Sequence, residues 1–416
     1  MKEITVIGGG ASGMAAAVEA SAFHHVTLFE KNEKLGKKLY ITGKGRCNLT
    51  NDCDPDTLIR NVKSNPKFLH SAFRSYSPGD VMEFLRAHGC PVKTERGNRV
   101  FPVSDHSSDV IKAFERALAE KKVSVRLNSE VRGIKQNGDR IEGVFVSENG
   151  ASLRFYASDA VIVATGGSSY PLTGSTGDGY RFAEALGLNV TDRHPSLVPL
   201  ETKESWPKAL SGLTLKNVSL SVFDGGKEIF YEFGEMLFTH FGISGPIVLT
   251  ASSELAGRFY KGECLAASID LKPALSLETL SERIRREIDE TPASSLQNVV
   301  KRLVPHALSP VIMETSGIDG SMRSSGLSKE GRVRLADALK KLPITLTGTR
   351  GFSEAVITRG GVDVKEIDPK TMRAKRFQNL YFAGEVLDVD ALTGGFNLQI
   401  AWSTGTAAGR ALREEV

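Results

Sequence analysis

The stretch GKKLYITGKGRCNLTN, from Gly36 to Asn51, combines the residue types that a redox centre or a phosphate-binding loop would need. It holds three glycines, four cations and one cysteine, Cys47. A neighbouring arginine can lower a thiol pKa and make the cysteine reactive. The other cysteines, Cys53, Cys90 and Cys264, give no C-x-x-C pair, which argues against a dithiol relay, a disulfide framework or a zinc site. We therefore expect the stretch to bind a cofactor, with Cys47 packed against it.

A glycine fingerprint near the N-terminus indicates a dinucleotide. Gly8-x-Gly10-x-x-Gly13 follows a short apolar strand and opens an alanine-rich helix, and Glu30 ends the next strand. The first glycine makes a tight turn, the second admits a pyrophosphate, and the helix N-terminus offers it N–H groups. Glu30 would accept hydrogen bonds from the ribose hydroxyls. We expect the same site to include Ala11, Ser12 and Lys31.

The C-terminal part of the chain favours FAD over NAD. A strand ends at Gly384-Glu385, and Gly394-Gly395 opens a helix whose N-terminus can face a second polar group of the cofactor. NAD enzymes rarely return the chain in this way. No second fingerprint follows a strand elsewhere, so NAD(P)H would dock transiently as hydride donor. Further FAD-binding residues are predicted at Val131, Thr165, Gly166, Gly384, Glu385, Asp388, Gly395, Asn397 and Leu398.

The stretch after Glu30 then lies beside the nucleotide. We expect Lys38 to approach a phosphate or ribose, and Arg46 to place positive charge near the flavin ring. Asn48 offers a donor and an acceptor to the ring edge. We expect Gly43 and Gly45 to let the backbone pass close to the flavin. A solvated basic loop is the alternative.

Two side chains are candidates for catalysis. His240, in FTHFGISGP, is a possible substrate-side polar group or general acid. A structural histidine explains the same residue equally well. Tyr170, just after ATGGSS, is a second possible proton donor, with ordinary packing as its alternative.

Apolar runs and glycine turns predict an α/β protein with a discontinuous, Rossmann-like FAD-binding domain at 1–190 and 343–416. Short alternating strands predict an inserted β-rich, barrel-like subdomain at 191–274. Amphipathic helical patterns predict a helical subdomain at 275–342.

Composition limits the possible partners. With 53 Lys and Arg against 49 Asp and Glu, the formal charge of +4 does not mark a nucleic-acid binder by itself. No segment has the length and apolarity of a membrane span, and we expect a cytoplasmic protein without a metal. The helical insert mixes both charge signs, which usually means a solvated face, although RNA binding stays open.

Several motifs together resemble the BaiN/RdsA-type flavoproteins, the NAD(P)/FAD-dependent family that includes aminoacetone-oxidase-type enzymes. They are the fingerprint, GKGRCNLTN, ATGGSSYPLTGSTGDGY, HFGISGP and FAGEVLDVDALTGGFNLQIAWSTG, and they span nearly the whole chain. Many members have a third glycine where this chain has Lys44, so we expect that position not to need the glycine conformation.

The resemblance implies an FAD-dependent oxidoreductase. The family's activities are the reduction of double bonds in 3-oxo bile-acid intermediates, the reduction of a ribosomal RNA uridine to dihydrouridine, and the oxidation of small amines such as aminoacetone by oxygen. The first two share hydride delivery to an electron-poor C=C bond. We therefore expect an enone reductase fed by NAD(P)H, with RNA docking or oxygen-dependent amine oxidation as the alternatives.

Overall fold

The computed structural model describes residues 1–413, which divide into two compact units. The first unit combines Met1–Ser196 with the segment that begins at Phe352, and the second unit is Leu197–Gly351. The chain thus leaves the first unit once and returns to it. This discontinuity confirms the predicted organisation of the cofactor domain.

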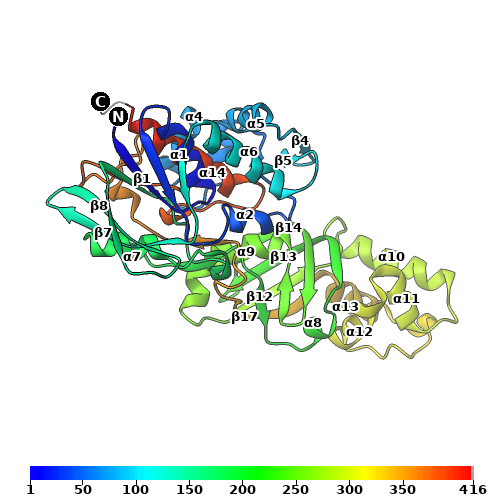
Figure 1. Cartoon of the computed structure of the whole chain (residues 1–416). Coiled ribbons are helices and arrows are strands. Elements are labelled where there is room, and N and C mark those ends of the chain that lie inside the picture. The colour runs from blue at the N-terminus through cyan, green and yellow to red at the C-terminus, as the bar shows by residue number, and fades with distance from the viewer. Residues whose placement is uncertain (414–416) are drawn as a thin grey trace. The chain divides into compact units, whose positions relative to one another are not determined.

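A five-stranded parallel sheet forms the centre of the first unit, in the order β19-β10-β1-β2-β6 (Figure 1). The middle strands are almost entirely buried, as is usual for a parallel sheet that helices cover on both faces. The strand bounds are β1 (Glu3–Ile7), β2 (His25–Phe29), β6 (Ser124–Arg126), β10 (Ala160–Val163) and β19 (Leu380–Phe382). The sheet and its helices confirm the predicted Rossmann-like architecture.

The fingerprint helix and the C-terminal helix pack closely together. They are α1 (Ala11–Ala20) and α14 (Phe396–Ala411). A Cβ atom at Gly405 would lie only 2.3 Å from the carbonyl oxygen of Ser12, so the absence of a side chain there permits the close approach. The end of the chain is thereby brought beside the N-terminal glycine turn.

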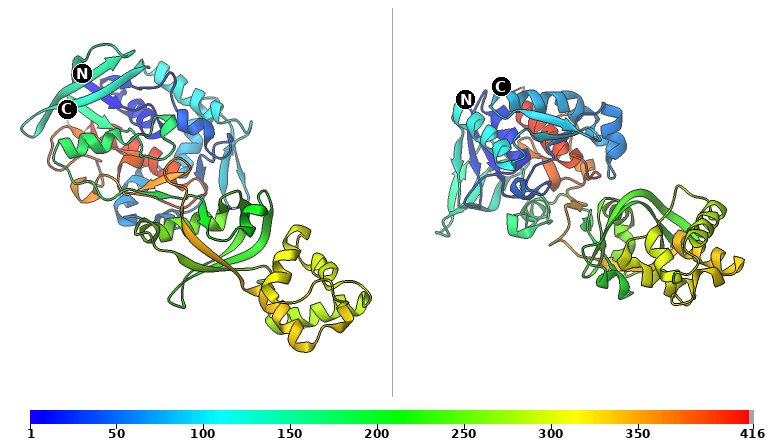
Figure 2. Two further views of the ribbon diagram at one scale, coloured as in Figure 1. Left: turned by 90° about the horizontal axis from the view of Figure 1, so that it is seen from below. Right: turned by 90° about the vertical axis from the view of Figure 1, so that its right-hand side faces the viewer.

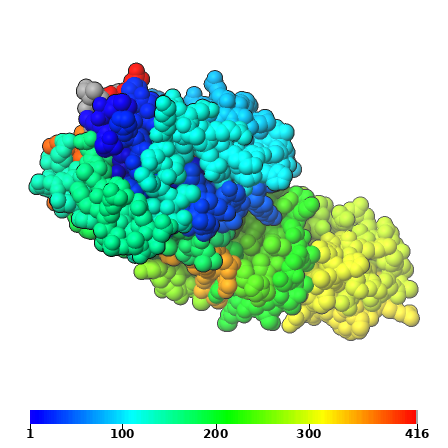
Figure 3. Space-filling model, in the orientation of Figure 1, coloured from blue at the N-terminus to red at the C-terminus, as the bar shows by residue number. Residues whose placement is uncertain are grey.

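Smaller elements surround this core. Two three-stranded antiparallel sheets have the orders β3-β5-β4 and β7-β8-β9, and β11 pairs with β18. Their bounds are β3 (Thr50–Asn51), β4 (Val92–Glu95), β5 (Arg99–Pro102), β7 (Ser129–Asn137), β8 (Arg140–Glu148), β9 (Arg154–Ala157), β11 (His194–Ser196) and β18 (Ile357–Arg359). The helices are α2 (Lys37–Ile41), α3 (Pro55–Asn61), α4 (His70–Ser75), α5 (Pro78–Ala87), α6 (Ser107–Glu120) and α7 (Asp178–Ala185). In the space-filling view, the cyan and green segments of this unit flank its blue N-terminal part (Figure 3).

The second unit contains a closed antiparallel barrel, in the order β12-β15-β14-β13-β16-β17. Its strands are β12 (Leu200–Thr202), β13 (Thr214–Asp224), β14 (Lys227–Thr239), β15 (Gly242–Ser244), β16 (Leu265–Asp270) and β17 (Leu342–Thr349). Its helices are α8 (Trp206–Ala209), α9 (Pro246–Tyr260), α10 (Leu277–Glu290), α11 (Leu296–Leu303), α12 (Ser309–Ser316) and α13 (Lys329–Lys340). Figure 2 shows the last four, in yellow and orange, grouped beside the green barrel.

The unit boundaries differ from the predicted domain limits by a few residues on each side. We expected the cofactor domain to resume at Pro343, but β17 pairs with β12 and β16 and so belongs to the barrel. Conversely, β11 pairs with β18, which keeps residues up to Ser196 in the first unit. Long-range strand pairing, which leaves no local mark in the sequence, sets both boundaries.

Candidate cofactor site

A cavity lies at the carboxyl ends of the parallel strands of the first unit, with about 1150 Å³ of empty space that is partly open to solvent. Open α/β sheets bind ligands in this position, because the loops after the strands converge there. Residues that directly follow β1, β2 and β10 form much of the wall. Thirteen predicted residues line the cavity, namely Gly8, Gly10, Ala11, Ser12, Glu30, Lys31, Lys38, Val131, Thr165, Gly166, Glu385, Asn397 and Leu398.

The glycine turn leaves room beside the start of α1. Gly8 has φ of +104°, and a Cβ there would lie 2.5 Å from the carbonyl oxygen of Ala164. Gly10 is the N-cap of α1 without a side-chain cap, and a Cβ there would meet no atom within 4 Å. The first turn of α1 therefore faces open space with a favourable dipole for an anion.

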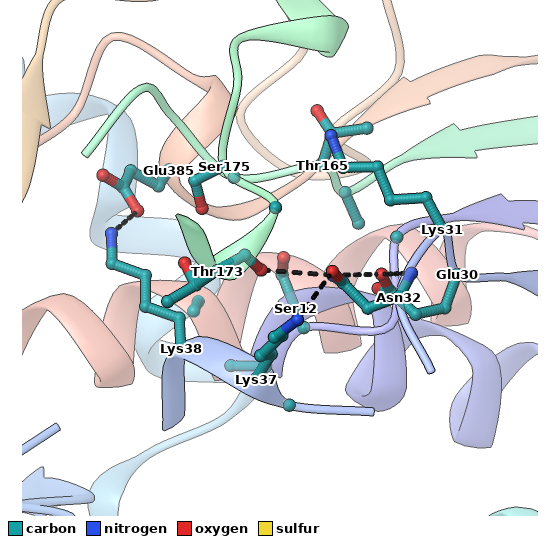
Figure 4. Close-up of a pocket in the computed structure, with 18 of the residues that line it drawn as sticks. Ser12, Glu30, Lys31, Asn32, Lys37, Lys38, Thr165, Thr173, Ser175 and Glu385 are labelled. Atoms are coloured by element: carbon teal, nitrogen blue, oxygen red, sulfur yellow. Dashed lines mark hydrogen bonds and ion pairs between the residues drawn. The ribbon is translucent and has the colours of Figure 1, made fainter. Parts of the chain in front are cut away.

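Glu30 is held rigidly at the wall of the cavity. Its carboxylate accepts hydrogen bonds from the backbone N–H of Gly9 (2.7 Å) and from the backbone and side-chain N–H groups of Asn32 (2.8 and 2.7 Å). Figure 4 shows Glu30 beside Asn32 in the cavity. A carboxylate oxygen can accept more than one hydrogen bond, so Glu30 retains capacity for a ribose hydroxyl.

Lys38 and Glu385 form an ion pair across the cavity wall. The Lys38 Nζ atom lies 2.8 Å from Glu385 Oε2 and 2.6 Å from Ser169 Oγ. The other carboxylate oxygen, Oε1, accepts hydrogen bonds from the Ser169 hydroxyl (2.7 Å) and the Thr358 N–H (2.9 Å). Figure 4 shows the pair, with Lys38 coming from α2 and Glu385 from the turn after β19.

Arg46 lies in a different cluster. Its guanidinium donates to Asp105 Oδ1 through Nε (2.9 Å) and Nη2 (2.6 Å), binds Glu95, and lies 4.1 Å from the centre of the Phe101 ring. Lys93 also contacts Asp105, at 2.9 Å. Arg46 is not among the residues that line the cavity, so its position differs from the expected one beside the cofactor ring.

Two polar side-chain atoms of the predicted site, those of Asn48 and Thr165, are buried without a partner. Within residues 1–413, neither Asn48 Oδ1 nor Thr165 Oγ1 makes a hydrogen bond, although both atoms are shielded from solvent. Buried polar atoms are nearly always paired, and an exception often marks the place of a ligand. Thr165 lines the cavity directly. Asn48 is not among the lining residues, so it is the Thr165 hydroxyl that fits a polar cofactor better than an empty apolar pocket.

Comparison with known proteins now assigns the chain to a family. A model described as HI0933-like protein Rossmann domain matches residues 2–411. The chain belongs to the HI0933-like Rossmann family. The resemblance inferred from the motifs is thereby confirmed.

Two named proteins are similar to this HI0933-like chain over nearly their full lengths. The 3-dehydro-bile acid delta(4,6)-reductase of Clostridium scindens is 31% identical over 421 residues, covering 100% of both chains. The ribosomal RNA dihydrouridine synthase of Haemophilus influenzae is 32% identical over 411 residues, covering 97% of both. These findings support an FAD-dependent oxidoreductase of this family.

Solved structures of steroid enzymes share the fold. The 3-ketosteroid delta1-dehydrogenase of Sterolibacterium denitrificans has a TM-score of 0.56 at 13% identity, covering 100% of both chains. The 3-ketosteroid-delta4-(5alpha)-dehydrogenase of Rhodococcus jostii RHA1 has a TM-score of 0.54 at 13% identity, covering 99% of this chain and 97% of that one. At these identities the likeness establishes the fold.

Four further glycines that were predicted to bind the cofactor do not line the cavity but allow close backbone packing. A Cβ at Gly13 would clash with Gly8, one at Gly43 with the Asn48 backbone, one at Gly384 with Ser12, and one at Gly395 with Thr50. These glycines therefore permit close packing behind the wall. Gly45 and Asp388 are also outside the lining, and burial raises the pKa of Asp388.

The loop around Cys47 has an unusual backbone. Lys44 and Cys47 both have φ of +58°, in the left-handed region that favours glycine. Our expectation that position 44 does not need this conformation was therefore wrong. The Cys47 side chain is fully buried, and burial together with nearby Cys90 raises the pKa of its thiol to about 12. A thiol in this state is protonated at neutral pH and is a poor nucleophile.

The two catalytic candidates lie in different units. Tyr170 belongs to the first unit, and its N–H donates to the carbonyl of Phe352 at 3.0 Å. Burial, with a further contribution from Glu354, raises the pKa of its phenol. His240 is an exposed residue of the second unit, after β14, with its ring against Phe241. Neither lines the cavity.

Sequence reasoning missed several polar residues of the site. Ser169 stands two residues after the strand-end glycine pair, and this spacing could have drawn attention to it. Asn32 stands two residues after Glu30 and could have been found as a partner for that acid. Thr358 contacts Glu385 because the chain, after passing through the second unit, re-enters the first unit and forms β18 there. No sequence pattern near Thr358 predicts this contact.

The described residues contain no helix with both the length and the apolar composition needed to cross a lipid bilayer.

Proposed function

We propose that the protein is an FAD-dependent reductase that adds hydride to a C=C bond conjugated with a carbonyl, such as that of a 3-oxo bile acid or steroid enone. The observation that carries the proposal is the strand-end cavity, in which a dinucleotide fingerprint meets a buried hydroxyl without a partner, that of Thr165. The similarity to the Clostridium scindens reductase supports the choice of substrate.

The residues present fit FAD. The space beside Gly10 and the free start of α1 suit a pyrophosphate, and Glu30 suits the adenosine ribose. Asn48 and Thr165 supply polar atoms that still need partners. When bound, FAD would accept hydride from a donor and pass it to the electron-poor carbon of the substrate. The chain must then bind both partners and supply a proton to the adjacent carbon.

We infer that Tyr170 is the first candidate for this proton. Its phenol is protonated at neutral pH, as a proton donor requires. Burial raises the pKa of this phenol and so makes it a weaker acid than a free tyrosine. It directly follows Ser169, which hydrogen-bonds Glu385 of the cavity wall. His240 is the second candidate, because an imidazole suits general acid catalysis near neutral pH.

Exchange of Tyr170 for phenylalanine tests the assignment. We expect Tyr170→Phe to lose about 10²-fold in substrate turnover. Reduction of bound FAD by NAD(P)H should keep its rate, because only the second half-reaction needs the proton. An unaffected Tyr170→Phe enzyme, with turnover lost in His240→Gln, would move the role to the histidine.

NAD(P)H is the proposed source of hydride. The chain carries one dinucleotide fingerprint, and we infer that this site is taken by FAD. The nicotinamide would therefore use the substrate's part of the cavity, and the two should compete. NAD(P)H and substrate should give ping-pong kinetics, since the donor must leave before the substrate enters.

Reduction of a ribosomal RNA uridine is the second candidate function. Similarity to dihydrouridine synthases of Haemophilus influenzae and Escherichia coli, at 32% and 31% identity, favours it. The uracil ring also presents a C=C bond conjugated with a carbonyl, so the hydride chemistry is shared. RNA must in addition bind through phosphates, and its affinity should fall steeply as salt is raised.

One experiment separates these functions. The purified protein, loaded with FAD, is reduced without oxygen, and its flavin absorbance is followed after addition of a steroid enone, ribosomal RNA, or oxygen with or without aminoacetone. Fast reoxidation by the enone supports the proposal. Reoxidation by RNA alone would establish the synthase activity, and continued oxygen uptake that depends on aminoacetone would establish an oxidase. A protein that cannot be loaded with FAD would overturn all three.

A further inference from the structure

The Lys38–Glu385 pair joins four separate segments at the cavity wall. Lys38 belongs to α2, Ser169 to the loop after β10, Thr358 to β18, and Glu385 to the turn after β19. Every contact among them lies between 2.6 and 2.9 Å. The side chains of Lys38 and Glu385 are only 25% and 13% exposed. The pair is therefore largely shielded from solvent and held from several directions.

The charges of this pair are balanced. Lys38 contributes one positive charge and Glu385 one negative charge, 2.8 Å apart. Both side chains line the cavity, so any molecule bound there experiences both. Loss of either partner would leave a single uncompensated charge at the wall. Such a charge acts strongly in a partly dry site, where water screens it poorly.

We propose that Lys38 and Glu385 act as one positioning unit whose charges cancel, so that neither charge alone shifts the reduction potential of bound FAD. The inference rests on the proposed function, because it requires FAD in the cavity. It replaces the single positive charge that the sequence suggested at Arg46 with a balanced pair, because the Arg46 guanidinium is committed to Glu95 and Asp105 outside the lining.

The sign of each effect follows from charge alone. Reduced cofactor carries more negative charge than oxidised cofactor, so positive charge at the wall favours reduction and negative charge opposes it. Lys38→Met leaves the Glu385 carboxylate uncompensated and should lower the potential. Glu385→Gln leaves the Lys38 ammonium uncompensated and should raise it. The double variant restores neutrality and should return close to the wild-type value.

The test is a redox titration of FAD-loaded protein against a reference dye, at FAD concentrations that saturate each variant. We expect each single variant to change the ratio of reduced to oxidised cofactor by about tenfold, which is about 30 mV for a two-electron couple. The shifts should have opposite signs and cancel in Lys38→Met/Glu385→Gln. A purely structural pair would instead give shifts that do not cancel.

Matched variants keep the test decisive. Lys38→Arg retains the charge and should keep the wild-type potential. Ser169→Ala removes a hydroxyl from the same network without altering charge, and should do the same. Arg46→Met should shift the potential much less than Lys38→Met. Should Lys38→Met fail to fold, the raised potential expected in Glu385→Gln, against an unchanged potential in Ser169→Ala, tests the sign by itself.

Two failures can be told apart. If wild-type protein cannot be loaded with FAD, the proposed function fails and the inference falls with it. If FAD binds but the single variants shift the potential in one direction, or the double variant does not return, the inference alone is overturned. A large shift in Arg46→Met would restore the arginine as the tuning charge.

Discussion

Lys38 and Arg46 lie eight positions apart in one basic stretch, yet they belong to clusters of opposite character. Lys38 pairs with one carboxylate, that of Glu385, at the wall of the cavity, where both side chains are mostly buried. Arg46 pairs with Glu95 and Asp105 outside the cavity lining, where the side chains are between 30% and 42% exposed. Neighbours in sequence thus have different electrostatic surroundings.

The difference shows that the number of partners does not measure the importance of a cation. Arg46 makes more hydrogen bonds than Lys38, but water screens them and can replace them. The Lys38 pair has fewer substitutes, because little water reaches the cavity wall there. Removal of the lysine would leave a buried charge, whereas removal of the arginine leaves carboxylates that solvent can reach.

The largest effect on stability is expected for Lys38→Met. We expect the free energy of unfolding of the cofactor-free protein to fall by about 3 kcal/mol, because the Glu385 carboxylate loses its counter-charge. Urea denaturation measures this. The matched control is Lys37→Met, since Lys37 also lines the cavity but pairs with an exposed carboxylate, Glu33. Equal losses in both variants would contradict the distinction between buried and exposed pairs.

A smaller, condition-dependent loss is expected for Arg46→Met. A hydrogen bond from Arg46 lowers the pKa of Glu95, and hydrogen bonds from Lys93 and Arg46 lower that of Asp105. A carboxyl group with a lowered pKa in the folded state adds stability above its unfolded pKa of about 4 and loses it as pH falls through the folded value. The gap between wild type and variant should therefore be full near pH 7.

Thermal unfolding across pH and salt checks the Arg46 prediction. The gap in Tm should narrow as pH falls below about 4 and should also narrow in about 1 M salt, which screens exposed pairs. A gap that persists unchanged in acid and in high salt would mean that Arg46 contributes through packing on Phe101 instead. Arg46→Lys is the matched control, because it keeps the charge and loses the fork of donors.

The contrast between the two cations also shows what the sequence could predict. The fingerprint of Gly8, Gly10 and Gly13 is local, since strand, turn and helix follow one another, and the Rossmann-like fold that contains it was predicted correctly. The partners of Arg46 could not be predicted, because Asp105 is 59 residues away and reaches it only through the folded chain. Residues that are close in sequence and share one turn form a pattern from which the local geometry can be predicted. Ion pairs between distant residues form no such pattern.

The buried threonine at the cavity offers a finer test of the cofactor site. Thr165 Oγ1 has no partner among the described residues, so Thr165→Val should leave the stability of the cofactor-free protein unchanged or slightly raised. The affinity for FAD should fall by about tenfold, because the oxygen would no longer meet the cofactor. Equilibrium binding of FAD, with urea denaturation of the free protein, measures both effects.

Thr42 supplies the matched control for Thr165. It also lines the cavity, but its hydroxyl already donates to the Lys38 carbonyl at 2.9 Å. Thr42→Val should therefore cost stability in the free protein and should affect FAD binding less. If Thr165→Val destabilises the free protein as much as Thr42→Val does, the threonine has a structural partner and the fit to the cofactor is weakened.

The smallest effect is expected at Cys47, which directly follows Arg46 in the basic stretch. Its thiol is fully buried with a pKa raised to about 12, so the thiolate needed for redox chemistry is nearly absent at neutral pH. Cys47→Ser should keep FAD bound and be reduced by NAD(P)H within about twofold of the wild-type rate. Thiol labelling of the folded protein at pH 8 should modify exposed Cys264 and spare Cys47. Loss of turnover in Cys47→Ser with FAD still bound would instead make the thiol part of the chemistry, and the stretch that holds Lys38 and Arg46 would then contribute a reactive group as well as charge.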